Sequence, residues 1–432
     1  MRETQLSVPQ WGALQLKLPS QVMALVCVPL YLYIFSCWLA KPLTLGANVA
    51  LSSVLAMTFC IGFFVIRISR TEFLKVVDRL SVELCALALM AMLSIFSLLN
   101  SSEPFRIFRI LFPCVLPFLL LVQLLALQSQ SPQRLFQIPR VHLWTGLILT
   151  GLFLILSSVG LRDYFFGAHR FHGGFENANQ HSVVLASLIP LVLCEISVAR
   201  RKRTMVGLIG AFLILFYLLL RTGSKTALFV GGATGLLFLF LVNFRSLSLT
   251  KRVAFLIGIG GLILGVRLFG LAVVGAIDPV LAEKLRMIFT GGVENYYSIQ
   301  SRQVLWEEAI RLGKEHWLIG AGAGEMILGI SHSHNLVLDY FRGIGIFGAI
   351  AVVILCLRIF WRCAVKSLLV LSGRDSVVDR RIWACYVSAS VYVVCNQLSD
   401  SFGPTTIAAL WLVYLPAVIT DTLGLGAKAQ VG

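Results

Sequence analysis

The most constraining feature of this sequence is a series of apolar runs, each about as long as the roughly 20 residues with which an α-helix crosses a bilayer core. Of the 432 residues, 58% are hydrophobic and only 13% are charged, and the mean hydropathy is +0.88. This composition is more apolar and less charged than that of a typical soluble domain. We therefore expect an all-α polytopic membrane protein with about twelve transmembrane helices. The expected spans lie near 20–40, 43–66, 80–100, 107–127, 141–160, 179–198, 204–220, 224–243, 253–275, 335–361, 382–399 and 404–424.

The placement of Lys and Arg predicts the orientation of these spans. One set of loops is rich in both, with "RISRTEFLKVVDR", "RRKR", "KR" and the cluster from Arg358 to Arg381. Basic loops stay in the cytoplasm, so both termini are expected there. The basic residues of these loops then explain the net charge of +16 through membrane topology, and no nucleic-acid partner is predicted. We expect a single membrane domain: helices 1–9 in residues 1–275, a larger periplasmic segment with an amphipathic helix in 276–334, and helices 10–12 in 335–432.

Two loops on the expected periplasmic side carry cations. Arg170 and Asn179 lie in "HRFHGGFENANQHS", and Arg221 and Lys225 lie in "RTGSKTAL". The first loop opens a helix, whose free N–H groups and positive dipole end suit a phosphate; the alternative is an ordinary capped junction. The cations of the second have no acidic neighbour in sequence and lie on the side that the positive-inside rule does not explain. This favours an anionic ligand over contact with lipid headgroups.

Two more arginines are placed where a charge needs a partner. Arg302 shares one face of the expected amphipathic helix with Leu305, Ala309 and Leu312, so it is aimed at the bundle. A structural salt bridge or an anionic ligand would satisfy it. Arg267 lies within the span 253–275, where it either reaches up to headgroups or meets a phosphate.

The stretch "SHSHNLVLDYFRGIGIFG" brings polar residues to the start of an apolar run. Asn335, Asp339 and Arg342 follow helical spacing and form a stripe, with His334 at its outer tip. A histidine there can accept a proton near neutral pH; the alternative is a water-facing residue at a helix entry. His332 and His334 alone are weak evidence for a metal, and neither a metal nor a cofactor is expected.

Several cations and one histidine at a single membrane boundary suit a lipid-linked pyrophosphate. Arg and Lys can hold the diphosphate and stabilise the charge that develops as it leaves. A base can then help an incoming hydroxyl to attack the anomeric carbon of a sugar.

Four stretches follow one another along the chain: "HRFHGGFENANQHS", "RTGSKTAL", "SRQVLWEEAIRLGKEHWLIGAGAG" and "HNLVLDYFRGIGIFG". In this order they resemble the motifs of the O-antigen ligase and polymerase superfamily of bacterial envelope enzymes. The resemblance is closest over about residues 170–350. The chain departs from the family motifs at three positions: Lys225 replaces the usual arginine, Trp317 replaces a proline and Gly343 replaces an acid.

The resemblance implies a metal-independent, inverting glycosyltransferase of the bacterial inner membrane, with its active site on the periplasmic side. Its donor is a glycan on undecaprenyl pyrophosphate. In a ligase, the preferred reading, the acceptor is a sugar hydroxyl of lipid A–core. His334 becomes the candidate base. The candidate diphosphate-binding residues are Arg170, Arg221, Lys225 and Arg302, to which we add Arg267; the candidate supporting residues are Asn179, Asn335, Asp339 and Arg342.

Three alternatives remain open. Within the superfamily, the chain could be an O-antigen polymerase or a protein O-oligosaccharyltransferase. From another class, a flippase of lipid-linked sugars would also bind a diphosphate. A flippase needs a polar path through the membrane, however, and the middles of the expected spans hold almost no ionisable residues.

Overall fold

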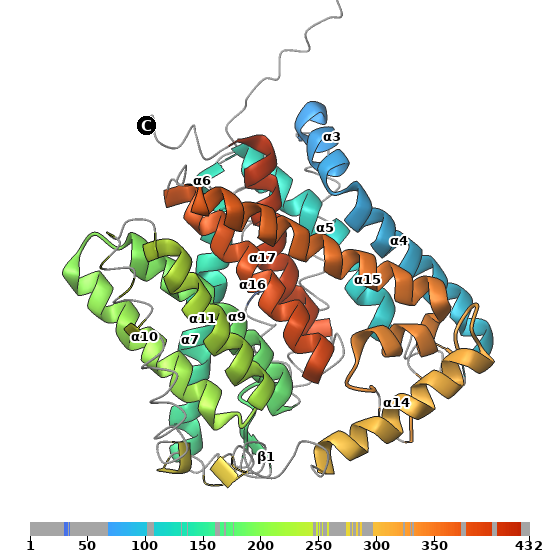
Figure 1. Cartoon of the computed structure of the whole chain (residues 1–432). Coiled ribbons are helices and arrows are strands. Elements are labelled where there is room, and N and C mark those ends of the chain that lie inside the picture. The colour runs from blue at the N-terminus through green and yellow to red at the C-terminus, as the bar shows by residue number, and fades with distance from the viewer. Residues whose placement is uncertain are drawn as a thin grey trace, which may run out of the picture.

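Over the residues that it describes, the computed structural model is an α-helical bundle with a short β-hairpin (Figure 1). The helices and strands are α3 (Arg70–Arg79), α4 (Ser81–Phe96), η2 (Ser97–Asn100), α5 (Phe108–Gln130), α6 (Pro132–Leu135), α7 (Gln137–Ser158), β1 (Phe166–Gly167), β2 (Arg170–Phe171), α9 (Ala178–Val198), α10 (Lys202–Arg221), α11 (Lys225–Phe244), α14 (Tyr297–Glu315), α15 (Leu336–Leu371), α16 (Val377–Ser399) and α17 (Pro404–Leu423). The structure describes residues 30–32, 34, 68–101, 108–130, 132–135, 137–159, 165–167, 170–175, 177–244, 248, 250, 253, 257–258, 274–276, 279, 282–283, 286, 297–322, 325–328, 330, 332–372, 377–399 and 404–424.

The described helices confirm an all-α polytopic membrane protein. Seven of them are long and apolar enough to cross a membrane, and α17 contributes a shorter apolar stretch, Ala409–Leu423. Every predicted span from 80–100 to 224–243, and each of the last three, coincides with a helix. The predicted spans 43–66 and 253–275, most of 20–40, and Arg267 lie outside the described residues, so the number of twelve stays a prediction.

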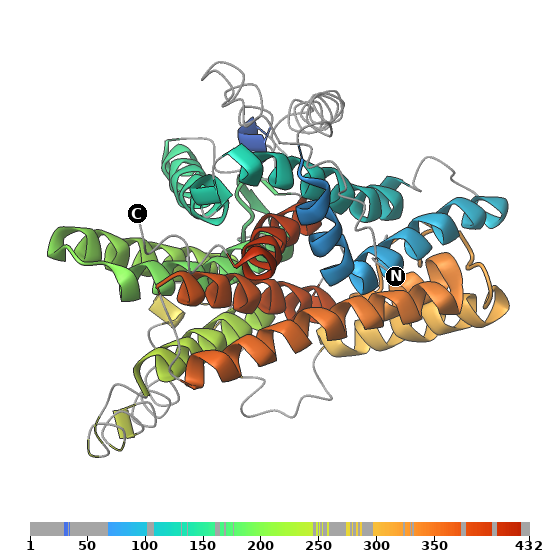
Figure 2. The ribbon, with the colours of Figure 1, turned by 90° about the horizontal axis from the view of Figure 1, so that it is seen from above.

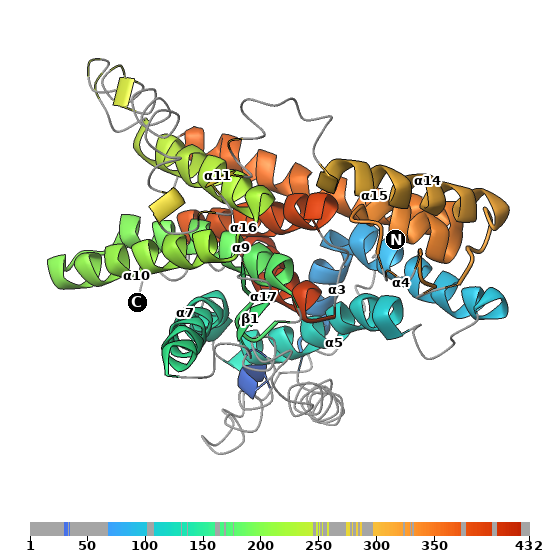
Figure 3. The same ribbon diagram turned by 90° about the horizontal axis from the view of Figure 1, so that it is seen from below.

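The centre of the bundle is formed by α9, α16 and α17. Of the apolar window of α9, 83% is buried, so this helix contacts protein on nearly all sides. It packs against α7, α10, α11 and α16, while α15 packs against α4, α14 and α16. Seen from above and from below, at 90° to the view of Figure 1, α4, α14 and α15 lie together at one side of the bundle and α10 lies at the other (Figures 2 and 3). Specific contacts fix the register: Ser388 donates a hydrogen bond to the Ser187 carbonyl (2.6 Å).

One end of the bundle, here called the Glu83 end, closes with buried ion pairs. The carboxylate of Glu83 accepts hydrogen bonds from Arg362 Nε (2.8 Å) and from the Tyr414 hydroxyl (2.7 Å), which joins α4, α15 and α17. Lys366 contacts Asp379 (3.1 Å) and Asp421 (2.9 Å) in the same region. A charge taken out of water needs such a partner. These contacts lie among the basic segments that were expected to be cytoplasmic.

Towards the other end of the bundle, α15 is interrupted close to its start. Ile344 (φ −135°, ψ 16°) and Gly345 (φ 80°, ψ −175°) leave the helical conformation, and the segment that follows α14 lies against this break. Backbone hydrogen bonds join the two segments: Ile346 N donates to the Trp317 carbonyl (2.8 Å), and Ala321 N donates to the Arg342 carbonyl (2.7 Å). The break frees backbone groups of α15, and the docked segment satisfies them.

Glycines make this contact possible. A Cβ atom on Gly345 would collide with the Leu318 carbonyl oxygen, and one on Gly320 would collide with the Gly343 backbone. The backbone angles of Gly345 are also essentially restricted to glycine. The spacing of Gly343, Gly345 and Gly348 is typical of close helix packing, but the neighbour of Gly345 is the docked segment and not a helix.

We predict that Gly345→Ala lowers the unfolding free energy by about 3 kcal/mol, because steric overlap adds to backbone strain. The measurement is the unfolding transition of the purified variant in detergent. Gly207→Ala in α10 is the control, since a Cβ there meets nothing within 4 Å. Equal stability of the two variants would show that the contact with α15 does not require glycine.

Candidate functional site

Arg170 connects the first two predicted motifs. It lies on β2, which pairs with β1 in an antiparallel hairpin just before α9. Its Nε donates to the Thr222 carbonyl (2.7 Å) in the α10–α11 turn, and its terminal nitrogen donates to Asn179 Oδ1 (2.7 Å) in the first turn of α9. A guanidinium held by two fixed acceptors keeps one orientation. Arg170 and Asn179, both predicted from the sequence as candidate site residues, are thus in direct contact.

The α10–α11 turn is shaped to receive this arginine. Gly223 adopts a left-handed conformation (φ 62°), and a Cβ there would lie 3.2 Å from Arg170 Nε. Thr222 stabilises the turn by accepting from Ser224 N at its hydroxyl (3.3 Å). Arg221 stands over the Phe166 ring of β1 at 5.3 Å, a cation–π distance. The β1–β2 hairpin and the α10–α11 turn are therefore joined by two arginine contacts, Arg170 with Thr222 and Arg221 with Phe166.

Arg302 of α14 and Lys225 at the start of α11 come together with Arg170. Both arginines act electrostatically on the Lys225 ammonium, and all three side chains are half-buried. We call Arg170, Lys225 and Arg302 the cation cluster. Its members come from three separate segments of the chain. Like charges repel, and an anion among them relieves the repulsion.

Helix α14 is amphipathic, as predicted. Leu305 and Ala309 are buried and form a small core with Ile327, against which Leu338 of α15 packs. On the outer face, Arg311 forms ion pairs with Glu308 and Glu315, both at 2.6 Å. The hydrogen bonds from Arg311 lower the pKa of the Glu308 carboxyl. The inner face thus carries Arg302, and the outer charges neutralise one another in solvent.

His334 is held in an unusual backbone conformation beside the start of α15. Its φ is +59°, and among the described residues only Leu328 shares a positive φ without being glycine. The side chain is half-buried, and its ring meets that of His332 edge-on at 4.5 Å. A histidine in the left-handed region is uncommon and costs free energy, so surrounding contacts must maintain it.

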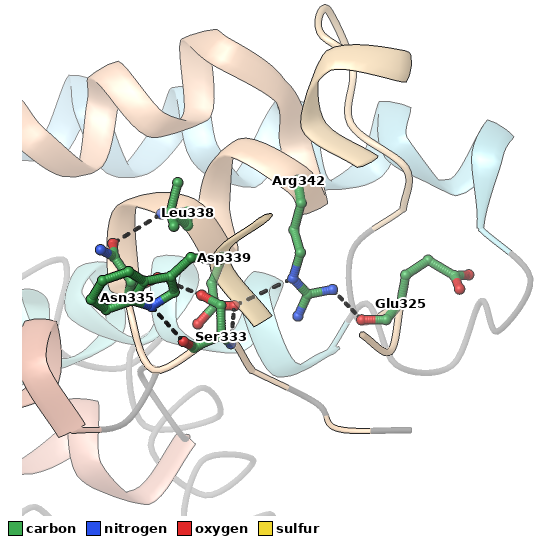
Figure 4. A network of polar contacts seen from close by, with 7 residues as sticks. Glu325, Ser333, Asn335, Leu338, Asp339 and Arg342 are labelled. Atoms are coloured by element: carbon green, nitrogen blue, oxygen red, sulfur yellow. Dashed lines mark hydrogen bonds and ion pairs between the residues drawn. The ribbon is translucent and has the colours of Figure 1, made fainter. Parts of the chain in front are cut away.

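Those contacts act on Ser333, the residue before His334. The backbone N–H of Ser333 donates to Asp339 Oδ1 (2.7 Å), and Arg342 Nε donates to the same oxygen (3.3 Å) (Figure 4). From α14, the Trp306 indole N–H donates to the Ser333 carbonyl (3.0 Å). Both backbone groups of this fully buried residue are therefore bound by side chains.

Asn335 and Arg342 complete the network in Figure 4. Asn335 caps α15, because its Oδ1 accepts from Leu338 N (3.2 Å), and it also accepts from Gln397 of α16 (3.0 Å). Arg342 donates to the Glu325 carbonyl as well as to Asp339. The predicted polar stripe is present, but Asp339 and Arg342 are buried and bind backbone. Their place in the structure is to hold the loop before α15.

Sequence reasoning did not single out Trp306 as a functional residue. Its spacing in the sequence could have indicated it. Trp306 follows Arg302 by four residues, so both lie on one face of α14. The described residues include no group of three His, Cys, Asp or Glu side chains that could hold a metal ion. The absence of a metal requirement stays a prediction.

Comparison with known proteins agrees with the motifs. Residues 210–353 match the family model described as O-antigen ligase. This range contains Arg221, Lys225, Arg302 and His334, while Arg170 and Asn179 precede it. No curated protein matches the chain. The expected resemblance to the O-antigen ligase and polymerase superfamily is confirmed.

The cation cluster predicts a binding site for a diphosphate. Arg302→Gln should weaken binding of inorganic pyrophosphate to the purified protein by about tenfold, the loss expected for one hydrogen bond to a charged group. Isothermal titration at low ionic strength measures it. Arg311→Gln is the matched control, because it removes the same charge from the outer face of the same helix. Equal weakening in both variants would mean that net charge, and not the cluster, binds the anion.

Proposed function

We propose that this chain, a member of the O-antigen ligase and polymerase superfamily, is a ligase of the bacterial inner membrane. In this proposal it transfers an O-antigen glycan from undecaprenyl pyrophosphate to a sugar hydroxyl of lipid A–core, on the periplasmic side. The observation that carries the proposal is the convergence of Arg170, Lys225 and Arg302 from three segments. The match to the family model described as O-antigen ligase supports the superfamily as a whole, and the choice of the ligase reaction over polymerisation is part of the proposal.

The cation cluster binds the diphosphate of the donor. Arg170 is already oriented by Thr222 and Asn179, so it loses little freedom when the donor arrives. As the bond from the anomeric carbon to the diphosphate oxygen breaks, negative charge grows on that oxygen. Fixed cations in a partly desolvated site stabilise the developing charge. Arg221, next to the turn, adds to the positive field, and Arg267 remains a candidate of the same kind.

His334 acts as the base. Its imidazole takes the proton of the acceptor hydroxyl while the oxygen attacks the anomeric carbon from the side opposite the diphosphate. A single displacement of this kind inverts the configuration at that carbon. The products are the glycan on lipid A–core, undecaprenyl pyrophosphate and a protonated histidine, which returns its proton to water. No metal takes part in these steps, because the cations neutralise the leaving group.

Analysis of envelope glycolipids in a strain lacking this chain tests the function. A ligase predicts accumulated lipid-linked polymer together with lipid A–core that bears no O-antigen. Lipid A–core bearing a single repeat unit would identify a polymerase instead. Unchanged lipopolysaccharide with loss of glycan from a protein would identify a protein O-oligosaccharyltransferase.

We predict that His334→Ala abolishes complementation of this strain, since a lost general base costs about 100-fold or more. His332→Ala is the matched control and should complement, because it removes the neighbouring ring only. Membrane levels of both variants are compared by immunoblot. Full activity of a normally inserted His334→Ala protein would remove this histidine from the mechanism. Transfer by isolated membranes is expected to persist in EDTA.

A further inference from the structure

We infer that Trp306 is a positioning residue, which orients His334 by holding the backbone of Ser333. The inference rests on the proposed function of His334 as the base. Trp306 does not need to touch either substrate, since its indole N–H already donates to the Ser333 carbonyl at 3.0 Å. That carbonyl belongs to the peptide bond whose nitrogen is the His334 nitrogen, so the hydrogen bond acts directly on the plane from which the histidine projects.

Two side chains from different helices hold this short segment. Asp339 of α15 accepts from the N–H of Ser333 at 2.7 Å, and Trp306 of α14 binds its carbonyl. With both backbone groups fixed, the path of the chain into His334 is fixed as well. With this peptide plane held, His334 keeps a positive φ, a conformation that a free loop would leave. Asp339 holds only the peptide plane before Ser333. Without Trp306, the plane between Ser333 and His334 would lose the hydrogen bond at its carbonyl.

Trp306 lies close along α14 to the proposed donor site. Arg302 of the cation cluster lies one turn earlier on the same helix, and side chains four residues apart share a face. Leu305 and Ala309 pack α14 against Ile327 and Leu338. The side chain proposed to bind the donor and the side chain that orients the base therefore come from one turn of α14.

Packing alone does not explain this tryptophan. The apolar contacts of α14 are made by Leu305, Ala309 and Leu312, whereas Trp306 is half-buried and directs its N–H to a carbonyl. Phenylalanine keeps an aromatic ring at the position and removes only the donor. Trp306→Phe therefore separates positioning from bulk.

The test is the steady-state kinetics of Trp306→Phe, with full-length protein in lipid nanodiscs, lipid-linked glycan as donor and lipid A–core as acceptor. We expect kcat to fall roughly 10- to 100-fold, the effect of a misplaced catalytic group, while KM for the donor stays within about twofold of the wild-type value. Trp306→His keeps a ring N–H donor and should recover part of kcat. Trp361→Phe, a 62% exposed tryptophan further along α15, is the control and should match the wild type.

The outcomes separate the possibilities. Wild-type kinetics in Trp306→Phe would overturn the inference and leave the proposed function standing. A rise in donor KM as large as the fall in kcat, or a lowered unfolding temperature without rescue by histidine, would also overturn it, because the residue would then be structural. Absence of transfer by the folded wild-type protein would instead refute the proposed function.

Discussion

The candidate site depends on the contact between the break in α15 and the segment that follows α14. Gly345 permits this break, through which Ile346 N donates to the Trp317 carbonyl and the Arg342 carbonyl accepts from Ala321 N. This contact is reinforced from η2, because Asn100 donates to the Gly320 carbonyl (2.8 Å). It anchors the C-terminal end of α14. The helix can then present Arg302 and Trp306 to two different loops at fixed positions.

The two ends of the bundle use charge in different ways. At the Glu83 end, acids meet cations directly: Glu195 contacts Arg140 at 2.7 Å and Arg381 at 3.4 Å, much as Glu83 contacts Arg362. At the other end, Asp339 and Arg342 form an ion pair within α15 (3.3 Å), but Arg170, Lys225 and Arg302 gather as like charges, and the first of them is oriented by neutral acceptors. Ion pairs tie helices together, whereas a group of like charges is suited to an anionic ligand. This contrast supports reading one end as structural and the other as functional.

The sequence predicted the helices well because membrane spans obey a simple rule of length and hydropathy. It also identified the cations, since their places at the ends of apolar runs are visible in one dimension. It did not predict which of them meet. The contact of Arg170 with Thr222 depends on the tertiary packing of hairpin and turn. Asp339 and Arg342 were predicted to form a polar stripe that supports the site, but their partners are the backbone of Ser333 and Glu325, which no periodicity reveals. The break at Gly345 lay inside a continuous apolar run and had no signal beyond its glycines.

We propose that cations and a histidine at one end of the bundle transfer a lipid-linked glycan. A defined reconstitution tests this: the purified chain is placed in vesicles with a glycan on undecaprenyl pyrophosphate and lipid A–core. Mass spectrometry of the extracted lipids should show glycosylated lipid A–core and free undecaprenyl pyrophosphate in equal amounts. If folded protein leaves both substrates unchanged, or only moves the donor across the bilayer, the claim is wrong.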